Sequence, residues 1–321
     1  MIEFCILGSG MAGSTIANLL SKKSSVEIFD KARGAGGRSS NRRFKNGASF
    51  DHGLQYIYPK NKLFKRFLIN LERKKIIKKW EGNHLDLTFR VKRPGYKYIG
   101  KKGNSDIQKY LVKNISTNYK SSIDKIIYKK DHWVILVNNK FYRCRNLILT
   151  CPYPQIITLA RKYLKKNFLK EKIVMQPNMT AMIAIKKDYN IPVSSIRFKN
   201  KILGWATNEN SKNRFKTKFN LWTIQSNETF AKKIIKKYKK KKKFYLQVIT
   251  KEFLNILGLK NSDIFFKELH GWKYSHNNEP IKLNSYWDKK LRLGICGDWF
   301  NGPRVEDAWI SAQDLYKKIK K

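Results

Sequence analysis

The chain has 321 residues, of which 41% are hydrophobic, so it is long enough for one large or two ordinary domains and too apolar for a disordered protein. It contains no run of about 18 apolar residues, and we therefore expect no membrane-spanning helix. Its 69 lysines and arginines against 23 acidic residues give a formal net charge of +46, which excludes an acidic surface.

This positive charge has two interpretations. A nucleic acid or an anionic membrane would be attracted to such a surface. Lysine is, however, spread through nearly every segment beside isoleucine and asparagine, as the AT-rich codons of a biased genome would produce, and we favour this compositional origin. The densest run, KKIIKKYKKKKKFY at 232–245, predicts a solvent-exposed helix face. We expect no sequence-specific nucleic-acid binding, although the excess charge should favour anionic ligands such as nucleotides.

The first residues and the cysteines indicate a reducing compartment. Residues 2–8, IEFCILG, show neither a basic lead nor a cleavage site, so we expect no secretory signal. The cysteines lie in apolar segments without CxxC pairs or zinc spacing, at Cys5, Cys144, Cys151 and Cys296. We therefore predict a cytoplasmic protein without a metal site.

Residues 3–30 predict a strand, a tight glycine turn, a helix and a second strand, in that order. Gly8, Gly10 and Gly13 form a GxGxxG pattern, and Asp30 follows at about the expected 20 residues. In such a unit the second glycine lets the backbone approach a pyrophosphate, and the third lets the helix pack closely on the strand. The acidic residue can accept hydrogen bonds from a ribose diol. The pattern predicts a dinucleotide site but leaves NAD and FAD open.

A second glycine cluster, KARGAGGRSSNRR at 31–43, follows the acidic end of this strand. Its RxxGGR pattern, from Arg33 to Arg38, indicates a second place where backbone glycines beside an arginine contact the same pyrophosphate, or the flavin side of it. NAD dehydrogenases do not need this second contact. The pattern resembles the extended FAD fingerprint of the glutathione-reductase-type flavoproteins, the group that holds the amine oxidases. The segment FDHGLQYIY at 50–58 is similar to the D-x-G-x-Q-Y segment that such proteins place against the isoalloxazine. An ordinary strand and turn remain the alternative for this segment.

The C-terminal stretch LRLGICGDWFNGPRVEDAW predicts a strand that ends at Gly297 and Asp298, a loop, and a helix from about Val305. A carboxylate after a strand can bind ribityl hydroxyls. A helix N-terminus can face the flavin pyrimidine carbonyl, where negative charge builds on reduction. Cys296 precedes this loop on the strand, and we expect it to pack in the core.

With these motifs the chain resembles the bacterial-type renalase-like FAD-dependent oxidoreductases, nearly from end to end. The C-terminal GDWFNGPRVEDAW is very close to the signature of that family. Asn104 stands where the family usually has a methionine. Further likeness lies in YIGKKGNSDIQKYL at 98–111, NLILTCPYPQIITLA at 146–160, LGWATNENSKNR at 203–214 and HGWKYSHNNEP at 270–280.

The resemblance implies an α/β fold, in which a Rossmann-type FAD-binding domain is joined to a second, antiparallel-sheet (α+β) substrate domain. The FAD-binding domain would combine 1–57, 99–158 and 286–321, and the substrate domain would take 58–98 and 159–285. Alternating segments between positions 132 and 225 support strands independently. Non-covalent FAD is also implied, and no cysteine stands in the C-terminal loop.

The activity implied by the resemblance is that of an oxidase. Hydride would pass from a small-molecule substrate, a dihydronicotinamide isomer of NAD(P)H, to flavin N5, and O2 would reoxidise the flavin to give hydrogen peroxide. The substrate ring becomes aromatic on losing hydride, so no strong general base is required, and the sequence shows no Ser-His-Asp or Cys-His set. His52 and His270 lie near the relevant segments, but a lone histidine is more often structural. The alternatives are a flavin amine oxidase or other FAD dehydrogenase, and a basic nucleic-acid-binding or membrane-binding protein with a vestigial FAD site.

The motifs and the resemblance together predict the site residues. Arg38 and Arg304 should help to attract the substrate pyrophosphate. The wall against which a flat ring would stack has aromatic candidates, for each of which core packing is the alternative: Tyr56, Trp272, Tyr274 and Trp299, with Trp205 and Trp222 beside them. The predicted cofactor-binding residues are Gly8, Gly10, Met11, Ala12, Gly13, Asp30, Lys31, Gly37, Arg38, Gly53, Leu54, Gln55, Tyr56, Gly297, Asp298, Arg304, Val305, Glu306 and Ala308.

Overall fold

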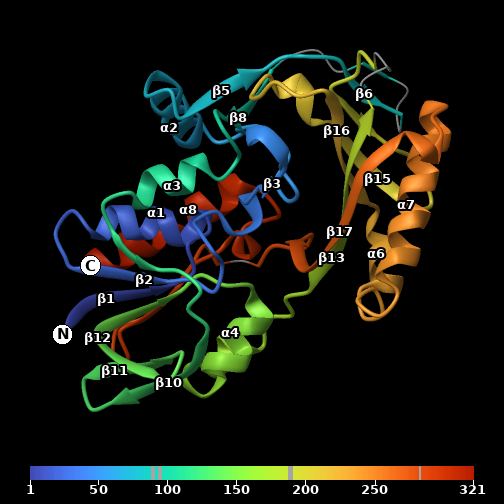
Figure 1. The fold of residues 1–321 in the computed structure, drawn as a ribbon. Helices are drawn as coiled ribbons and strands as arrows, with labels where there is room; N and C mark the ends of the chain where they lie inside the picture. The colour runs from blue at the N-terminus through green and yellow to red at the C-terminus, as the bar shows by residue number, and fades with distance from the viewer. Residues whose placement is uncertain (88–90, 93–95, 187–190, 282) are drawn as a thin grey trace.

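The structure, a computed structural model, describes residues 1–87, 91–92, 96–186, 191–281 and 283–321. Two large sheets, each covered by helices, lie side by side and divide the molecule into two halves (Figure 1). Both chain termini lie in the half that contains the first sheet.

The first sheet has a parallel centre and an antiparallel flank. β1 pairs in parallel with β12 and β2, and β9 and β19 extend the parallel part. The consecutive strands β10, β11 and β12 form the antiparallel flank. The main path, in spatial order, is β10 (Ile123–Lys129), β11 (His132–Val137), β12 (Lys140–Leu149), β1 (Ile2–Leu7), β2 (Val26–Phe29) and β9 (Ser116–Asn118), and β19 (Leu293–Ile295) and β18 (Tyr286–Asp288) continue from β12.

Successive residues of β1 point into two different cores, and this alternation is why helices cover both faces of the sheet. Phe4 and Ile6 pack in the core that also receives Cys296, as predicted. Cys5 and Leu7 pack in the opposite core. The first core lies under α1 (Met11–Leu20), α2 (Lys62–Arg73), α3 (Asp106–Val112) and α8 (Val305–Lys320), and the second lies under α4 (Tyr153–Ala160) and α5 (Lys166–Leu169).

The second sheet is antiparallel except where β14 pairs in parallel with β6. α6 (Glu228–Ile234) and α7 (Lys242–Leu257) cover its outer face, and the opposite, inner face is turned towards the first half (Figure 1). Its strand order is β17 (Ile264–Asn277), β13 (Met175–Lys186), β16 (Phe219–Ser226), β15 (Leu203–Asn208), β14 (Ser195–Arg197), β6 (His84–Asp86) and β7 (Val91–Lys92). The other described strands form two separate two-stranded sheets, β3 (Arg42–Arg43) with β4 (Ser49–Phe50) and β5 (Ile77–Trp80) with β8 (Lys97–Gly100).

This architecture confirms the predicted α/β class, with a Rossmann-type domain and a second domain built on a largely antiparallel sheet. Strands from the two ends and the middle of the chain make the first sheet, whereas β6, β7 and β13 to β17 make the second. The residue boundaries of the two domains stay a prediction. Among the helices that the structure describes, none combines the length and apolar composition that a bilayer crossing requires.

Candidate active site

The two glycine clusters lie against each other. Gly10 precedes the first turn of α1, and a Cβ built on Gly37 would stand 3.1 Å from the Cα of Gly10. Gly36 donates its backbone N–H to the Ser9 carbonyl at 3.0 Å, which joins the two loops. A Cβ on Gly13 would stand 1.9 Å from the Gly8 carbonyl oxygen, so only glycine lets the helix approach the strand this closely. The second cluster therefore forms one backbone surface with the first.

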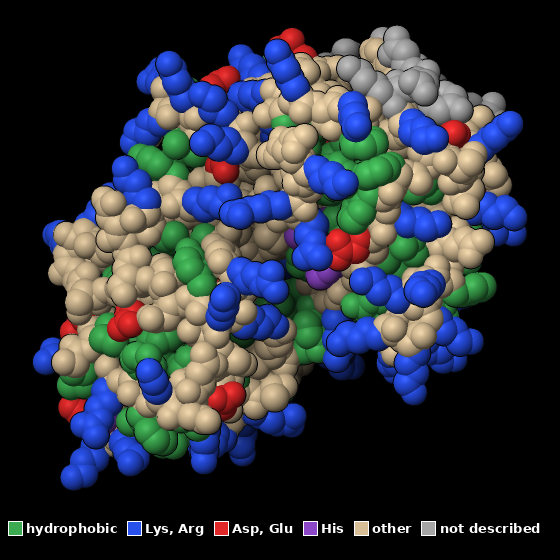
Figure 2. All heavy atoms as spheres, viewed as in Figure 1, with side chains coloured by type: hydrophobic (Ala, Val, Ile, Leu, Met, Phe, Trp, Pro, Cys, Tyr) green, Lys and Arg blue, Asp and Glu red, His purple; other side chains and the backbone are tan. Residues whose placement is uncertain are grey.

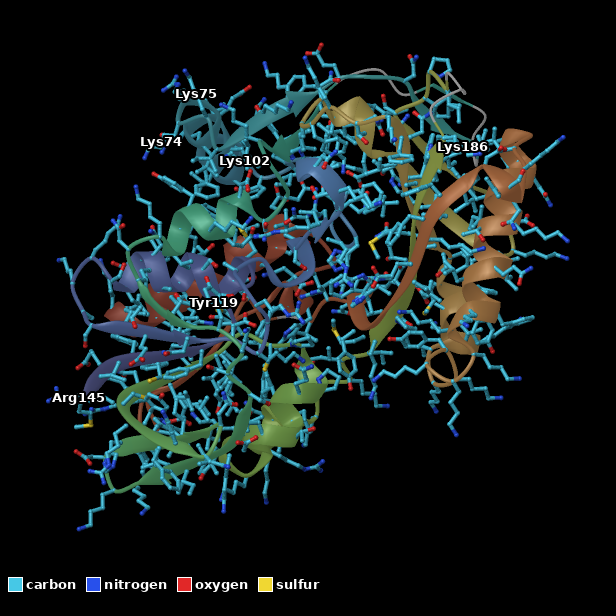
Figure 3. The ribbon with its side chains drawn as sticks, in the orientation of Figure 1. Lys74, Lys75, Lys102, Tyr119, Arg145 and Lys186 are labelled. Carbon is cyan, nitrogen blue, oxygen red and sulfur yellow. The ribbon has the colours of Figure 1, made fainter. Side chains whose placement is uncertain are left out.

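Asp30 follows β2 beside these loops, and its carboxylate is held in a fixed orientation. It accepts hydrogen bonds from the Ser9 N–H and hydroxyl, both at 2.6 Å, and from the Ala32 N–H at 2.8 Å. Tyr119 lies near this loop, inside the first domain (Figure 3). Burial raises the pKa of the Tyr119 hydroxyl; a hydrogen bond to the Ala35 backbone opposes the shift and the Asp30 charge adds to it. A carboxylate has about four acceptor positions, so Asp30 keeps capacity for a further donor such as a ribose hydroxyl.

A bidentate ion pair ties the second glycine cluster to the C-terminal segment. The two Nη atoms of Arg38 donate to the two carboxylate oxygens of Asp298 at 2.6 and 2.5 Å. The same guanidinium donates to the Ser275 carbonyl of β17 at 2.7 Å, so it also contacts the second domain. Gly297 donates its N–H to the Ser311 hydroxyl of α8 at 3.0 Å. Three segments that the sequence singled out separately are thus joined at Arg38.

Arg304 stands just before α8 and is also ion-paired. Its guanidinium lies 3.2 Å from both Glu306 and Asp307. The Glu306 carboxylate also accepts the N–H groups of Lys60 and Asn61, at 2.7 and 2.9 Å, which fixes the loop before α2. Because Arg38 and Arg304 are each neutralised by carboxylates, they offer less unbalanced positive charge to a substrate than the sequence predicted.

Two atoms at predicted cofactor residues are buried without a hydrogen-bond partner. They are Oε1 of Gln55, an acceptor, and Nη1 of Arg304, a donor. The Gln55 Nε2, in contrast, donates to the carbonyls of Asp51 and Gly53. Buried polar atoms are nearly always hydrogen-bonded, so an open acceptor and an open donor here fit a polar ligand.

Four charged side chains form a buried cluster that we call the ion-pair cluster: Asp51, Glu209, Lys212 and Arg214. The Lys212 ammonium lies 2.7 Å from Asp51 and 2.9 Å from Glu209, and Arg214 also contacts Asp51. The four side chains are at most 1% exposed. Burial acts to raise the pKa of Asp51, but the Arg214 and Lys212 charges outweigh it and lower the pKa to about 2. Burial raises the pKa of Glu209 despite the nearby Lys212 charge.

Asn104, the departure from the family pattern, belongs to this cluster. Its side-chain oxygen accepts from Arg214 Nη2 at 2.8 Å and from the Gly100 N–H at 3.1 Å, and its amide donates to the Leu54 carbonyl at 2.7 Å. A methionine could make none of these three bonds well, because its thioether is a weak acceptor and no donor. The asparagine therefore fastens the cluster to the segment that holds Gln55.

The inner face of the second sheet lies against this segment. Cross-strand partners share a face, and the register aligns His270, Thr180, Gln225 and Trp205 in one row across β17, β13, β16 and β15. The Gln225 amide donates to the Gly53 carbonyl at 2.8 Å, so this row faces the first domain. The row is a candidate substrate wall of aromatic and neutral polar groups.

The predicted aromatic wall residues divide into two groups. Trp272 donates from Nε1 to the His52 carbonyl at 2.9 Å, and the Tyr56 ring lies 5.5 Å from the Trp205 ring, so these three line the inner face. Trp299 and Trp222 are completely buried in the cores, and we leave both out of the wall. Partly buried Tyr274 packs against the second core of the first domain.

His52 and His270 are far apart in the sequence, and the structure brings their rings together. Their ring centroids are 5.0 Å apart, and both rings contact Trp272, at 5.1 and 4.4 Å. Burial, followed by the proximity of His270, lowers the pKa of His52 to about 4, and burial also lowers the pKa of His270. Both imidazoles are therefore neutral at pH 7, and the His52 Nδ1 is buried without a partner. Alternation along β17, which puts residue 270 on the inner face, was the signal that could have paired them.

Figure 2 shows histidine and acidic side chains between the two domains, with lysines and arginines around them. In the part of the chain that the structure describes, no group of three or more His, Cys, Asp or Glu side chains is arranged to hold a metal ion. The site is thus made of backbone glycines, paired charges, aromatic rings and two neutral imidazoles.

Comparison with known proteins agrees with this arrangement. Residues 6–71 match the family model of an NAD(P)-binding Rossmann-like domain. The whole chain is similar to a protein described as a protoporphyrinogen oxidase from Exiguobacterium sp. 255-15, with a TM-score of 0.75 and 9% identity over 99% of this chain and 98% of that chain. A putrescine oxidase bound to putrescine matches with a TM-score of 0.69 and 9% identity over 99% of each chain. A protein from Pyrococcus furiosus matches with a TM-score of 0.67 and 11% identity over 99% of this chain and 98% of that one. The chain therefore contains a dinucleotide-binding Rossmann-like segment and has the two-domain fold of these proteins over nearly its whole length.

Proposed function

We propose that this chain is an FAD-dependent oxidoreductase of the renalase-like kind, with FAD held non-covalently between the first domain and the inner face of the second sheet. The observation that carries the proposal is the open acceptor of Gln55 and the open donor of Arg304, both at residues that the FAD motifs select. The joined glycine loops support it, because a backbone surface without side chains suits a pyrophosphate. The four cysteines are free thiols, which fits the reducing cytoplasm that the sequence predicts.

Each part of the site has a role on this proposal. Gly10 and Gly37 receive the pyrophosphate, Asp30 accepts from the adenosine ribose, and Asp298, fixed by Arg38, accepts from the ribityl chain. The segment that ends in Gln55 provides the polar edge for the ring system. When bound, FAD supplies a hydride acceptor whose electrons dioxygen then takes up to give hydrogen peroxide.

The substrate on this proposal is a dihydronicotinamide dinucleotide, an isomer of NAD(P)H. Trp272, Trp205 and Tyr56 offer flat apolar surfaces on which such a ring can stack. Loss of hydride makes the ring aromatic, so the protein must orient the substrate and exclude water but need not remove a proton. The common 4-dihydro form should be a poor donor, because a wall that positions another ring carbon for transfer holds C4 away.

The histidine pair favours amine oxidation as a second candidate function. Amine oxidation releases protons, and two neutral imidazoles beside Trp272 could accept one. This candidate requires His52 or His270 for the reaction, whereas the dihydronicotinamide candidate does not. The two are therefore separable by substitution.

The test begins with the cofactor. Acid precipitation of the purified yellow protein should leave FAD in the supernatant; colourless protein that takes up no FAD, or flavin that stays in the pellet, contradicts the proposal. Anaerobic stopped-flow mixing should then show rapid bleaching by 2- or 6-dihydro isomers of NAD(P) and slow bleaching by amines. His270→Gln should leave bleaching by the isomers within a few fold. Bleaching by an amine at least as fast as by any isomer, and its loss in His270→Gln, would establish the second candidate instead.

A further inference from the structure

The turn between α6 and α7 and the helix ends beside it carry the densest positive charge in the chain. We call residues 232–245 the α6–α7 tip. Nine of its first twelve residues are lysines, and all nine are exposed. No acidic residue occurs from 229 to 251, and the nearest one, Glu228, is paired with Lys232 at 2.6 Å. Figure 2 shows blue side chains gathered at the lower right, where Figure 1 places this tip.

Composition alone does not account for the tip. Lysine and arginine make up 69 of 321 residues in the whole chain, about one in five, but three in four between 232 and 243. The tip also carries an exposed aromatic residue, Phe244. This phenylalanine lies in the first turn of α7, directly after five consecutive lysines, and is 58% exposed. One exposed phenylalanine is ordinary by itself, but its position directly beside the lysine run joins an aromatic ring to a dense positive charge, a combination typical of segments that bind at a membrane surface.

We propose that the α6–α7 tip docks on an anionic phospholipid membrane. Clustered lysines are attracted by the negative surface potential of such a membrane, and an aromatic ring among them can enter the boundary between headgroups and acyl chains. The tip contains lysine but no arginine. Lysine is a flexible point charge that suits mobile headgroups, whereas arginine is preferred where phosphates have a fixed geometry, as in nucleic acids.

The placement of the tip leaves the candidate active site free. α6 and α7 pack on the outer face of the second sheet, through residues such as Leu269. His270, the next residue of β17, belongs to the row on the opposite face. Membrane contact at the tip would therefore anchor the molecule without covering the space between the domains, and it requires no particular substrate.

Flotation of the purified full-length protein with lipid vesicles tests the proposal. The protein should float with vesicles that contain phosphatidylglycerol and not with phosphatidylcholine alone, and raising the salt concentration should weaken the binding. The triple variant K239Q/K240Q/K241Q should lower the partition coefficient at least about tenfold, and Phe244→Ser should lower it severalfold. A matched control, K74Q/K75Q/K102Q, removes the same charge from exposed lysines on the far side of the molecule (Figure 3). It should bind like the parent.

Three outcomes overturn the proposal. The parent protein does not bind phosphatidylglycerol vesicles; the control triple variant loses as much binding as the tip variant; or the parent binds a mixed-sequence RNA oligonucleotide more tightly than vesicles and only the tip variant loses that binding. Circular dichroism and thermal melting show that each variant is folded, so that loss of binding is assigned to the surface and not to unfolding.

Discussion

Two sets of polar groups, one that includes Asp51 and one that includes Gln55, are built in opposite ways. The ion-pair cluster places two acids and two bases together in the interior, where each charge lies against an opposite one. The other set, which we call the open region, comprises the amide of Gln55, the neighbouring His52 and the partly exposed guanidinium of Arg304, and it leaves a buried acceptor and a buried donor open. In the ion-pair cluster every charged group has an opposite charge beside it, although Glu209 Oε2 makes no hydrogen bond among the described residues. The open region instead has an acceptor and a donor that no side chain in the described part of the chain pairs.

Buried polar groups have two different roles in this protein: some fix the position of chain segments, and others are left open for a ligand. Paired charges in a dry interior rarely add net stability over apolar packing, but they are costly to unpair, and so they fix which segments lie together. The ion-pair cluster joins Asp51 of the first domain to residues 209–214 of the second and thereby sets the position of the 51–56 segment. The open atoms of that segment then face the space where a cofactor is proposed.

The largest effect is expected from breaking the ion-pair cluster. Lys212→Met removes one base and leaves Asp51 and Glu209 with excess negative charge in the interior, which should lower the free energy of unfolding by about 3–5 kcal/mol. Asn104→Met removes one acceptor of Arg214 without changing the charge and should lower it by about 1–3 kcal/mol. Urea unfolding followed by circular dichroism measures both.

Lys102→Met is the matched control for these variants, because it makes the same Lys-to-Met change at an exposed position two residues before Asn104 (Figure 3). It should change the free energy of unfolding by less than about 0.5 kcal/mol. If Lys212→Met proved no more harmful than Lys102→Met, the ion-pair cluster would not be what holds the two segments together.

A smaller effect, confined to ligand binding, is expected in the open region. Gly10 has a φ of −72°, which any residue adopts, and a Cβ there would meet nothing nearer than the Gly37 Cα at 4.0 Å. Gly10→Val should therefore leave the free energy of unfolding of the FAD-free protein nearly unchanged. Its side chain would fill the space proposed for the pyrophosphate and lower FAD affinity at least roughly tenfold, as an overpacked contact of 1–3 kcal/mol does. Flavin fluorescence titration measures the affinity.

Gly34→Val is the control in the neighbouring loop, since a Cβ at Gly34 meets no atom within 4 Å and this glycine is not a predicted cofactor residue. It should bind FAD like the parent protein. Equal FAD affinity in Gly10→Val and Gly34→Val would show that the nucleotide site lies elsewhere.

The same contrast explains what could be predicted from the sequence. Gly8 has a φ of +109°, and a Cβ on Gly13 would meet the Gly8 carbonyl. Asp30 accepts hydrogen bonds from Ser9 and Ala32. These constraints are local, so the strand, turn and helix order is sufficient to identify the three residues, although Thr150 also closes the space beside both glycines. The fold class follows from that unit and from the alternating segments further along the chain. Cys296 was assigned to the core because it sits on a strand just before the loop, and it is completely buried.

The rest depended on contacts across long stretches of the chain. Asp51 and Lys212 are 161 residues apart in sequence. The meeting of His52 with His270 depends on the register of β17 against β13, which includes two irregularities. No single segment carries that information. A place in a cofactor motif, conversely, does not ensure a place in the site. Trp299 lies next to Asp298 in the C-terminal motif, but its ring packs on Phe300 in the core, with centroids 4.0 Å apart.

The smallest effect is expected from the pH dependence of the open region. Burial, followed by the proximity of His270, lowers the pKa of His52 from its ordinary 6.5 to about 4, while the negative charge of Asp51 opposes the shift. The native state thus keeps this ring neutral at pH values where the unfolded chain binds a proton, so acidification below about pH 6.5 favours unfolding. With these two pKa values the loss is about 1 kcal/mol between pH 7 and pH 5.5. His52→Gln should remove that part of the slope.

Asp51 separates this window from that of the ion-pair cluster. Its pKa of about 2 lies below the ordinary 3.8, so its stabilising contribution is present above about pH 4 and is lost only as the pH falls towards 2. Urea unfolding at pH 7 and pH 5.5 therefore leaves Asp51 out but includes His84 of β6, whose pKa burial also lowers to about 4. The difference in slope between the parent and His52→Gln isolates the contribution of His52, and His132→Gln, a substitution on β11 outside the site, should keep the slope of the parent. A slope that His52→Gln leaves unchanged would mean that His52 already holds its proton at pH 5.5. A His52 ring that is protonated in the native state needs an acceptor for its Nδ1–H. His52 would then be hydrogen-bonded and would not belong to the open region.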